Sequence, residues 1–205
     1  MLLGVAGVTA LLIGERTPGA FLLLLSLFHA GVGAARLQAG FTVARHHKPS
    51  LRGLWELVWT TALLATLVYL NVHWLFERGH IEAAFITYGD PDSRQAVTLS
   101  LTLVALCLMT LFVQKRSSGS MFTPEQFRGH TLFSTVILTL FALLNVIYNP
   151  WLAPWLHASA LGLIDWLAIG GSWLAFTLVR EFTIHNQKHS RKAVLALHRA
   201  KHAKR

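Results

Sequence analysis

Long runs of apolar residues are the feature that most constrains how this chain folds. Two of them, residues 95–113 and 131–148, contain no charged residue. About 20 apolar residues in a helix cross the roughly 30 Å hydrocarbon core of a bilayer. Across the chain, 54% of residues are hydrophobic and 13% are charged, whereas a soluble domain carries about 25% charged residues. We therefore expect lipid to surround most of the chain.

Six apolar segments predict the fold class: an all-α, polytopic membrane protein, built as a bundle of about six transmembrane helices. The segments are residues 1–13, 19–35, 53–76, 95–113, 131–148 and 161–179. The first measures only about 20 Å as a helix, so we interpret it as the second half of a span whose beginning is missing. Trp55 and Trp74 lie near the ends of the third segment, as aromatic residues do at the level of the headgroups.

Positive charges are unevenly divided among the connections between these segments. Residues 36–52 hold four Lys and Arg, residues 114–130 hold three and the stretch from Arg180 holds eight, while the other connections hold Arg16, Arg78 and Arg94. The count is 15 against 3, and Lys and Arg concentrate in cytoplasmic loops. We therefore predict an integral protein of a bacterial-type inner membrane or a plasma membrane, with both termini in the cytoplasm.

The charge distribution also divides the chain into a transmembrane helical domain, residues 1–180, and a basic cytoplasmic tail, residues 181–205. The tail alternates Lys, Arg and His with apolar residues such as Leu195 and Leu197. This pattern is typical of a helix that lies on anionic lipid headgroups, and a specific protein partner is the alternative. The net charge of +9 comes from Lys and Arg that lie mostly in the connections predicted to be cytoplasmic. Because membrane orientation accounts for these charges, we do not expect nucleic acid as a partner.

Motifs of nucleotide and metal chemistry are absent from the sequence. It has no Gly-rich phosphate-binding loop followed by Lys and Ser or Thr, and no His-Glu-x-x-His segment. No two of the eleven histidines are expected to face each other at one depth, as a bis-histidine haem requires. The single cysteine, Cys107, allows no disulfide within the chain. We therefore expect neither a cofactor nor an enzyme.

Polar residues at membrane depth are the candidates for function, because burying them unpaired is costly. The candidate ion-path residues are Ser26, His29, Asn145 and Asp165. Asp165 is either a helix N-terminal carboxylate, favoured by the helix dipole, or a proton or cation site. Asn145 either bonds a neighbouring helix or coordinates an ion. Glu56, four residues after Arg52, is either part of a surface ion pair or a ligand.

Several short motifs occur in a recognisable order. Residues 161–167 form Leu-Gly-Leu-Ile-Asp-Trp-Leu and are followed by Arg180-Glu181, while the preceding segment ends in Asn149-Pro150. Ser93-Arg94-Gln95 opens the fourth segment, and residues 14–18 form the turn between the first two. In this order the segments resemble the C-terminal membrane domain of cation-transporting P-type ATPases of the calcium-pump kind. The resemblance covers nearly the whole chain and implies a role in cation transport.

The chain also departs from the pattern of that family. The family carries an Asn-x-x-Thr-Asp-Gly ion-binding motif in its second helix. Aligning its Gly with Gly31 places Ser26, His29 and Ala30 at the Asn, Thr and Asp positions, whereas a hard cation prefers several oxygen ligands, some of them charged. The phosphorylated Asp-Lys-Thr-Gly motif is absent. The resemblance therefore implies a catalytically empty membrane domain.

Three functions are compatible with these features. The first is a subunit, scaffold or remnant that packs against another membrane protein, such as a P-type ATPase. The second is a small self-contained ion channel or carrier, lined by Asp165, Asn145 and His29. The third is a fragment of a full pump whose start lies upstream of Met1. The lipid bilayer is a partner in all three.

Overall fold

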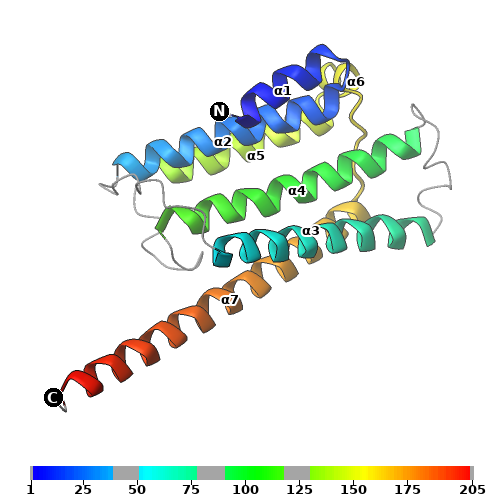
Figure 1. The fold of residues 1–205 in the computed structure, drawn as a ribbon. Helices are drawn as coiled ribbons and strands as arrows, with labels where there is room; N and C mark the ends of the chain where they lie inside the picture. The colour runs from blue at the N-terminus through cyan, green and yellow to red at the C-terminus, as the bar shows by residue number, and fades with distance from the viewer. Residues whose placement is uncertain (1, 39–50, 78–90, 118–129, 204–205) are drawn as a thin grey trace.

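The chain folds into a bundle of helices that run roughly side by side (Figure 1). The computed structural model describes residues 2–38, 51–77, 91–117 and 130–203. Its helices are α1 (Leu2–Leu12), α2 (Arg16–Gln38), α3 (Leu51–Glu77), α4 (Pro91–Ser117), α5 (His130–Tyr148), α6 (Leu152–Leu156) and α7 (Leu163–Ala203). The residues in these ranges form no strand, so the predicted all-α membrane bundle is confirmed.

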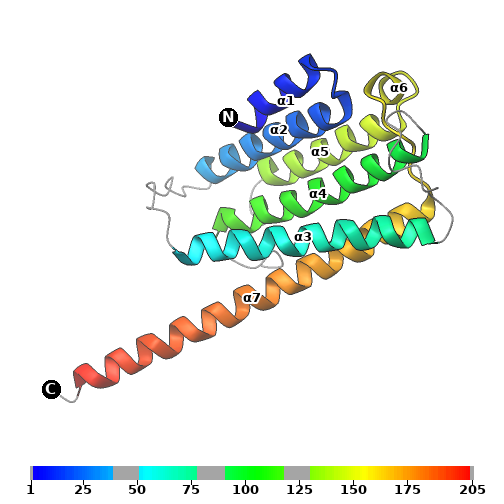
Figure 2. The same cartoon turned by 45° about the vertical axis from the view of Figure 1, so that its right-hand side comes forward.

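Helix α4 is the centre of the bundle. It packs against α2 on one side and against α3 and α7 on the other, while α2 also contacts α1, α5 and α6. Figure 2 shows this order, with α7 crossing beside α3. Leu99 and Leu103 of α4 are fully buried, as are Phe28 of α2 and Phe176 of α7. More than half of the apolar stretch of α4 is buried, against 28% in α5 and α7, so the outer helices present most of their apolar surface to lipid.

Four helices have the length and composition of membrane spans. Their apolar stretches are Arg16–Ala35, Arg94–Gln114, Thr131–Tyr148 and Leu163–Asn186, and α3 adds a shorter apolar stretch, Val58–His73. Helix α1 has only 11 residues, about 16 Å at 1.5 Å per residue. It is thus shorter than a span, as its 13-residue apolar run predicts.

Helix α7 combines the predicted final span and the predicted helix of the tail in one continuous element. The final span was expected to end near Val179, but α7 continues to Ala203 over 41 residues. That is about 62 Å of helix, twice the thickness of the hydrocarbon core, and its second half runs clear of the other helices (Figure 2). The cause is local: from Ser172 onward the helix contains neither Gly nor Pro, the two residues that most readily end a helix.

Helix α6 lies in the connection between α5 and α7, directly after Asn149-Pro150-Trp151. It ends at His157, which has a φ of 60°. The N–H groups of His157 and Ala158 donate to the carbonyls of Pro154 and Ala153, which is the bonding pattern of a Schellman C-cap.

Three features stay predictions, and two of them concern residues outside the described ones. The segments 39–50, 78–90 and 118–129, which hold four of the 18 Lys and Arg counted for orientation, are among them. So are the side chains of the tail from residue 187 onward. The orientation, the domain boundary at residue 180 and the contact of the tail with lipid headgroups therefore stay predictions.

Glycines bring α1 and α2 into close contact. Gly14 has a φ of 93° and forms the turn, with the N–H of Glu15 donating to the carbonyl of Ala10; only glycine takes this conformation without steric cost. Along the two helices, a Cβ at Gly19 would lie 2.7 Å from Leu11 Cγ and 3.0 Å from the carbonyl oxygen of Gly7. Small residues of this kind allow helices to approach closely in lipid.

The glycine contact predicts the effect of adding one methyl group. Gly19→Ala forces α1 away from α2, and we expect it to lower the free energy of unfolding in detergent by about 1–3 kcal/mol. Gly33→Ala is the matched control on the same helix, because nothing lies within 4 Å of a Cβ at Gly33. The control should be neutral or slightly stabilising, since Ala favours helix. Equal losses in both variants would contradict the close contact.

Candidate functional site

Buried threonines account for much of the polar surface inside the bundle, and their own helices satisfy them. The hydroxyls of Thr98, Thr102 and Thr110 of α4 donate to the carbonyl four residues earlier at 2.7–3.0 Å. Thr139 of α5 and Thr177 of α7 bond in the same way, both at 2.8 Å. Such bonds are local to one helix, although Thr98 also accepts the backbone N–H of Ser159 and Thr110 the indole N–H of Trp173.

Asp165 is buried at the start of α7, with 3% of its surface exposed. One carboxylate oxygen, Oδ2, accepts the backbone N–H of Gly162 at 2.8 Å and the side-chain amide of Gln95 of α4 at 2.9 Å. An acidic side chain three residues into a helix that bonds back to the N-cap N–H is half of a capping box. Asp165 therefore caps α7 and ties it to α4; we call Gln95, Gly162 and Asp165 the Asp165 cap.

The other three candidate residues lie apart from Asp165. Ser26 of α2 faces α1, where a Cβ at Gly4 would lie 3.0 Å from its hydroxyl oxygen. His29 is exposed, with its ring 4.7 Å from the ring of Phe112. Asn145 of α5 donates to the carbonyl of Phe141 at 2.9 Å. Among the described side chains, no hydrogen bond joins any two of the four candidates.

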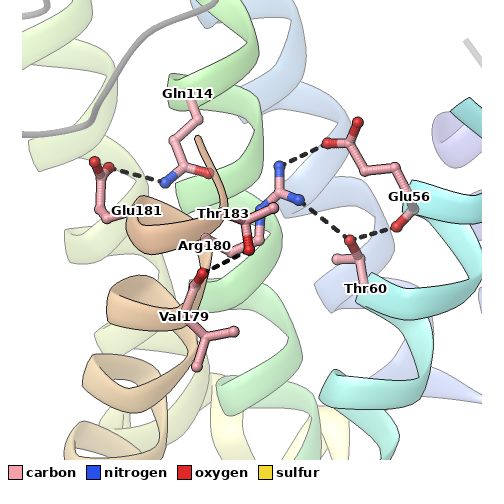
Figure 3. Close-up of polar contacts among 7 residues, drawn as sticks. All are labelled: Glu56, Thr60, Gln114, Val179, Arg180, Glu181 and Thr183. Atoms are coloured by element: carbon pink, nitrogen blue, oxygen red, sulfur yellow. Dashed lines mark hydrogen bonds and ion pairs between the residues drawn. The ribbon is translucent and has the colours of Figure 1, made fainter. Parts of the chain in front are cut away.

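A second polar cluster, which the sequence did not predict, centres on Arg180 of α7. Its guanidinium donates from Nη2 to Glu56 Oε1 of α3 at 2.9 Å and from Nη1 to the Thr60 hydroxyl at 3.4 Å. Thr60 in turn donates to the backbone carbonyl of Glu56 at 2.7 Å. Figure 3 shows Arg180 reaching from α7 to α3, with Gln114 of α4 on its other side.

Gln114 extends this cluster to the central helix. Its amide donates to Glu181 Oε1 of α7 at 3.1 Å. Glu56, Thr60, Gln114, Arg180 and Glu181 together form what we call the Arg180 cluster. Gln114 Oε1 and Arg180 Nε are buried without a hydrogen-bond partner in the described part of the chain, and an unpaired buried polar atom costs about 1–3 kcal/mol. The cluster thus joins α3, α4 and α7, and the two unpartnered atoms lower the free energy of unfolding.

The sequence contained a signal for the Glu56–Arg180 pair. The sequence favours Arg52 as the ion-pair partner of Glu56, or makes Glu56 a ligand. It groups Arg180 with the positive charges of the tail. If α3 enters and α7 leaves at the same membrane face, however, these two opposite charges lie at one depth. The described partner of Glu56 is Arg180, whereas the side chain of Arg52 is outside the described residues.

Contacts of aromatic and polar side chains fix the opposite end of the bundle. Tyr148 of α5 donates to the carbonyl of Leu161 at 2.6 Å and accepts the indole N–H of Trp166. Arg16 of α2 donates to the carbonyl of Trp155 at 3.1 Å and lies 5.3 Å from the centre of its ring. These bonds attach the connection around α6 to α2 and α7.

Two further polar contacts each join a pair of helices. Asn71 of α3 donates to Ser172 of α7 at 2.6 Å, and Trp173 of α7 donates to Thr110 of α4 at 2.8 Å. Within the described residues, no group of three or more His, Cys, Asp or Glu could hold a metal ion. Among the described side chains, these contacts join one helix to another.

The sequence of this chain matches a known protein family. The family model described as cation transporting ATPase, C-terminus, matches residues 4–184. The chain belongs to this family. It is an integral membrane domain, as its four apolar helices indicate, and the resemblance found in the sequence is confirmed. No curated protein and no solved structure matches the chain. The matched residues of this ATPase C-terminal domain include both the Asp165 cap and the Arg180 cluster.

The burial of the two partners predicts an asymmetry in the Arg180 cluster of this domain. The Arg180 side chain is 4% exposed and that of Glu56 is 39% exposed. Glu56→Ala leaves a buried guanidinium unpaired, so we expect it to lower the free energy of unfolding by about 2 kcal/mol or more. Arg180→Met should cost about 1 kcal/mol, since Glu56 can still reach water.

A double-mutant cycle checks this prediction. The variant with both substitutions should lose no more stability than Arg180→Met alone, because no charge is then left buried. Unfolding followed by circular dichroism in detergent gives the three free energies. Losses that simply add would show that the two residues are not coupled.

Proposed function

We propose that this ATPase C-terminal domain serves cation transport as a scaffold or subunit, packing against a partner, and that its described helices hold no ion site of their own. The observation that carries the proposal is the engagement of Asp165. Its Oδ2 already accepts two hydrogen bonds, from Gly162 and Gln95. A cation bound there would compete with both donors and open the helix cap.

The second helix supports the same proposal. At the positions of the family ion motif it carries Ser26, His29 and Ala30, which offer one hydroxyl and no carboxylate. Ser26 faces α1 across Gly4, and His29 is exposed beside Phe112. A hard cation requires several converging oxygens, and these side chains supply too few.

We also propose that the domain is not itself an enzyme. The 205 residues contain no Asp-Lys-Thr-Gly segment and no nucleotide-binding loop. Phosphoryl transfer would then depend on residues outside them. Function in this proposal comes from the stable presentation of a helical surface, which the Asp165 cap and the Arg180 cluster hold together near the two ends of the apolar stretch of α7.

The orientation is part of the proposal. The count of 15 Lys and Arg against 3 supports cytoplasmic termini, which would place the Arg180 cluster at the cytoplasmic face. A green fluorescent protein fused after Arg205 should fluoresce, and alkaline phosphatase fused at the same point should be inactive. Active phosphatase would reverse the orientation.

Co-purification from native membranes tests the function most directly. The tagged chain, extracted in mild detergent, should carry a protein with phosphorylation and nucleotide-binding domains at a stoichiometric ratio. The matched control is the same tag on an unrelated membrane protein. Recovery of the chain alone, combined with cation flux in liposomes that Asp165→Asn abolishes, would instead support the self-contained channel or carrier.

A further inference from the structure

Two buried polar atoms of the Arg180 cluster have no hydrogen-bond partner in the described part of the chain. They are Arg180 Nε of α7 and Gln114 Oε1 of α4. Each of the two residues is 3% exposed, so neither bulk water nor a lipid headgroup supplies the partner. Folded proteins leave few buried polar groups unpaired. The two atoms therefore require a partner that is not one of the described side chains.

The other hydrogen bonds of the two side chains fix which atom is left over. Gln114 donates from its amide nitrogen to Glu181 Oε1 at 3.1 Å, so turning the amide over would place its oxygen against a carboxylate. Arg180 uses Nη2 on Glu56 and Nη1 on Thr60, which leaves the hydrogen on Nε. Figure 3 shows the Gln114 amide beside the guanidinium, with its oxygen on the side of Arg180.

The chemistry of the cluster limits what the missing partner can be. An anion would lie against Gln114 Oε1, which is itself an acceptor, and near the carboxylates of Glu56 and Glu181. A cation would be repelled by the guanidinium of Arg180, whose Nε–H donates and does not accept. An apolar group would leave both atoms unpaired. The class that remains is a small neutral group that accepts one hydrogen bond and donates another.

We propose that a water molecule binds in the Arg180 cluster, where it accepts a hydrogen bond from Arg180 Nε and donates one to Gln114 Oε1. Buried waters typically bond polar groups that have no other partner, two to four for each water. The side chain of Glu56 is 39% exposed and gives the cluster an edge through which the water exchanges with solvent. The inference goes beyond the proposed scaffold function and does not depend on it.

The water connects two contacts that are otherwise separate. Gln114 bonds Glu181 between α4 and α7, while Arg180 bonds Glu56 between α7 and α3. A water shared by Gln114 and Arg180 joins these contacts into one network across three helices. Water-mediated hydrogen bonds are nearly as favourable in enthalpy as direct ones. The water thus offsets the cost of the two atoms that the described side chains leave unpaired.

Nuclear magnetic resonance of the full chain in detergent micelles tests the proposal. Arginine labelled with nitrogen-15 at Nε gives each Nε–H its own signal, and Arg180→Lys identifies the signal of Arg180 by removing it. A water held in the cluster should give a dipolar cross-peak to this Nε–H, with opposite signs in the laboratory frame and the rotating frame. Arg94 is exposed and serves as the internal control, since passing hydration water gives equal signs.

A matched pair of substitutions shows whether Gln114 holds the water. Gln114→Met removes the acceptor and should abolish the cross-peak, while the Nε–H signal of Arg180 remains. Gln95→Met is the control, because Gln95 also lies on α4 and donates to a carboxylate of α7, that of Asp165, at 2.9 Å. Both variants remove a bond between α4 and α7, but only the control should keep the cross-peak.

Three results would overturn the proposal. Equal signs at Arg180 and Arg94 would show that no water is held at Arg180. A cross-peak that persists in Gln114→Met would come from another source, such as a hydroxyl that exchanges its proton with solvent. A scalar coupling across a hydrogen bond from Arg180 Nε to the Gln114 amide would show that the two atoms bond each other directly. The first and third results come from the unsubstituted chain and do not depend on how a variant folds.

Discussion

The absence of water around its helices is the constraint on which this structure depends. In the hydrocarbon region each polar group must find its partner within the protein. The threonines of α4 and α5 meet this requirement inside their own helices. Polar groups that cannot do so are paired between helices, and these pairs determine which helices are neighbours. Packing by apolar side chains alone distinguishes poorly between alternatives, since lipid chains are as apolar as Leu.

Helix α7 illustrates how two polar pairs place one long element. At its start, Asp165 bonds Gln95 of α4. Near the far end of its span, Arg180 bonds Glu56 of α3 while Glu181 accepts from Gln114 of α4. The two attachments lie about 22 Å apart along the helix at 1.5 Å per residue. They hold α7 against both α3 and α4, and beyond them the helix leaves the bundle.

The same requirement accounts for the contacts that the ion-path candidates make. Asp165 and Asn145 are polar at membrane depth, which is a valid signal for function, but each is bonded for a structural reason in the described structure. Ser26 faces the glycine contact with α1. His29 is exposed, with its ring beside that of Phe112.

Sequence alone predicted the helices well and their neighbours poorly. Apolar runs indicate where the spans begin and end, because a helix needs about 20 apolar residues to cross the hydrocarbon core of a bilayer. The expected end of the span at Val179 followed the change in hydropathy, whereas α7 continues into the tail because backbone propensity does not change there. The pairing of Glu56 with Arg180 was missed because it joins residues 124 positions apart, and one-dimensional patterns favour partners within a turn, such as Arg52. The short helix α6 depends on a left-handed His157, a conformation for which the sequence gives no warning.

The central claim is that polar groups within these helices hold the domain together and do not bind a cation. Thermodynamic linkage tests it directly: a cation bound only by the folded state raises stability by about 2.7 kcal/mol at 100 times its dissociation constant. The measurement is the unfolding midpoint of the purified domain in detergent, titrated with calcium, magnesium, potassium and sodium at constant ionic strength. The account predicts no saturable shift with any of them. A saturable rise with one cation that Asp165→Asn removes would contradict it.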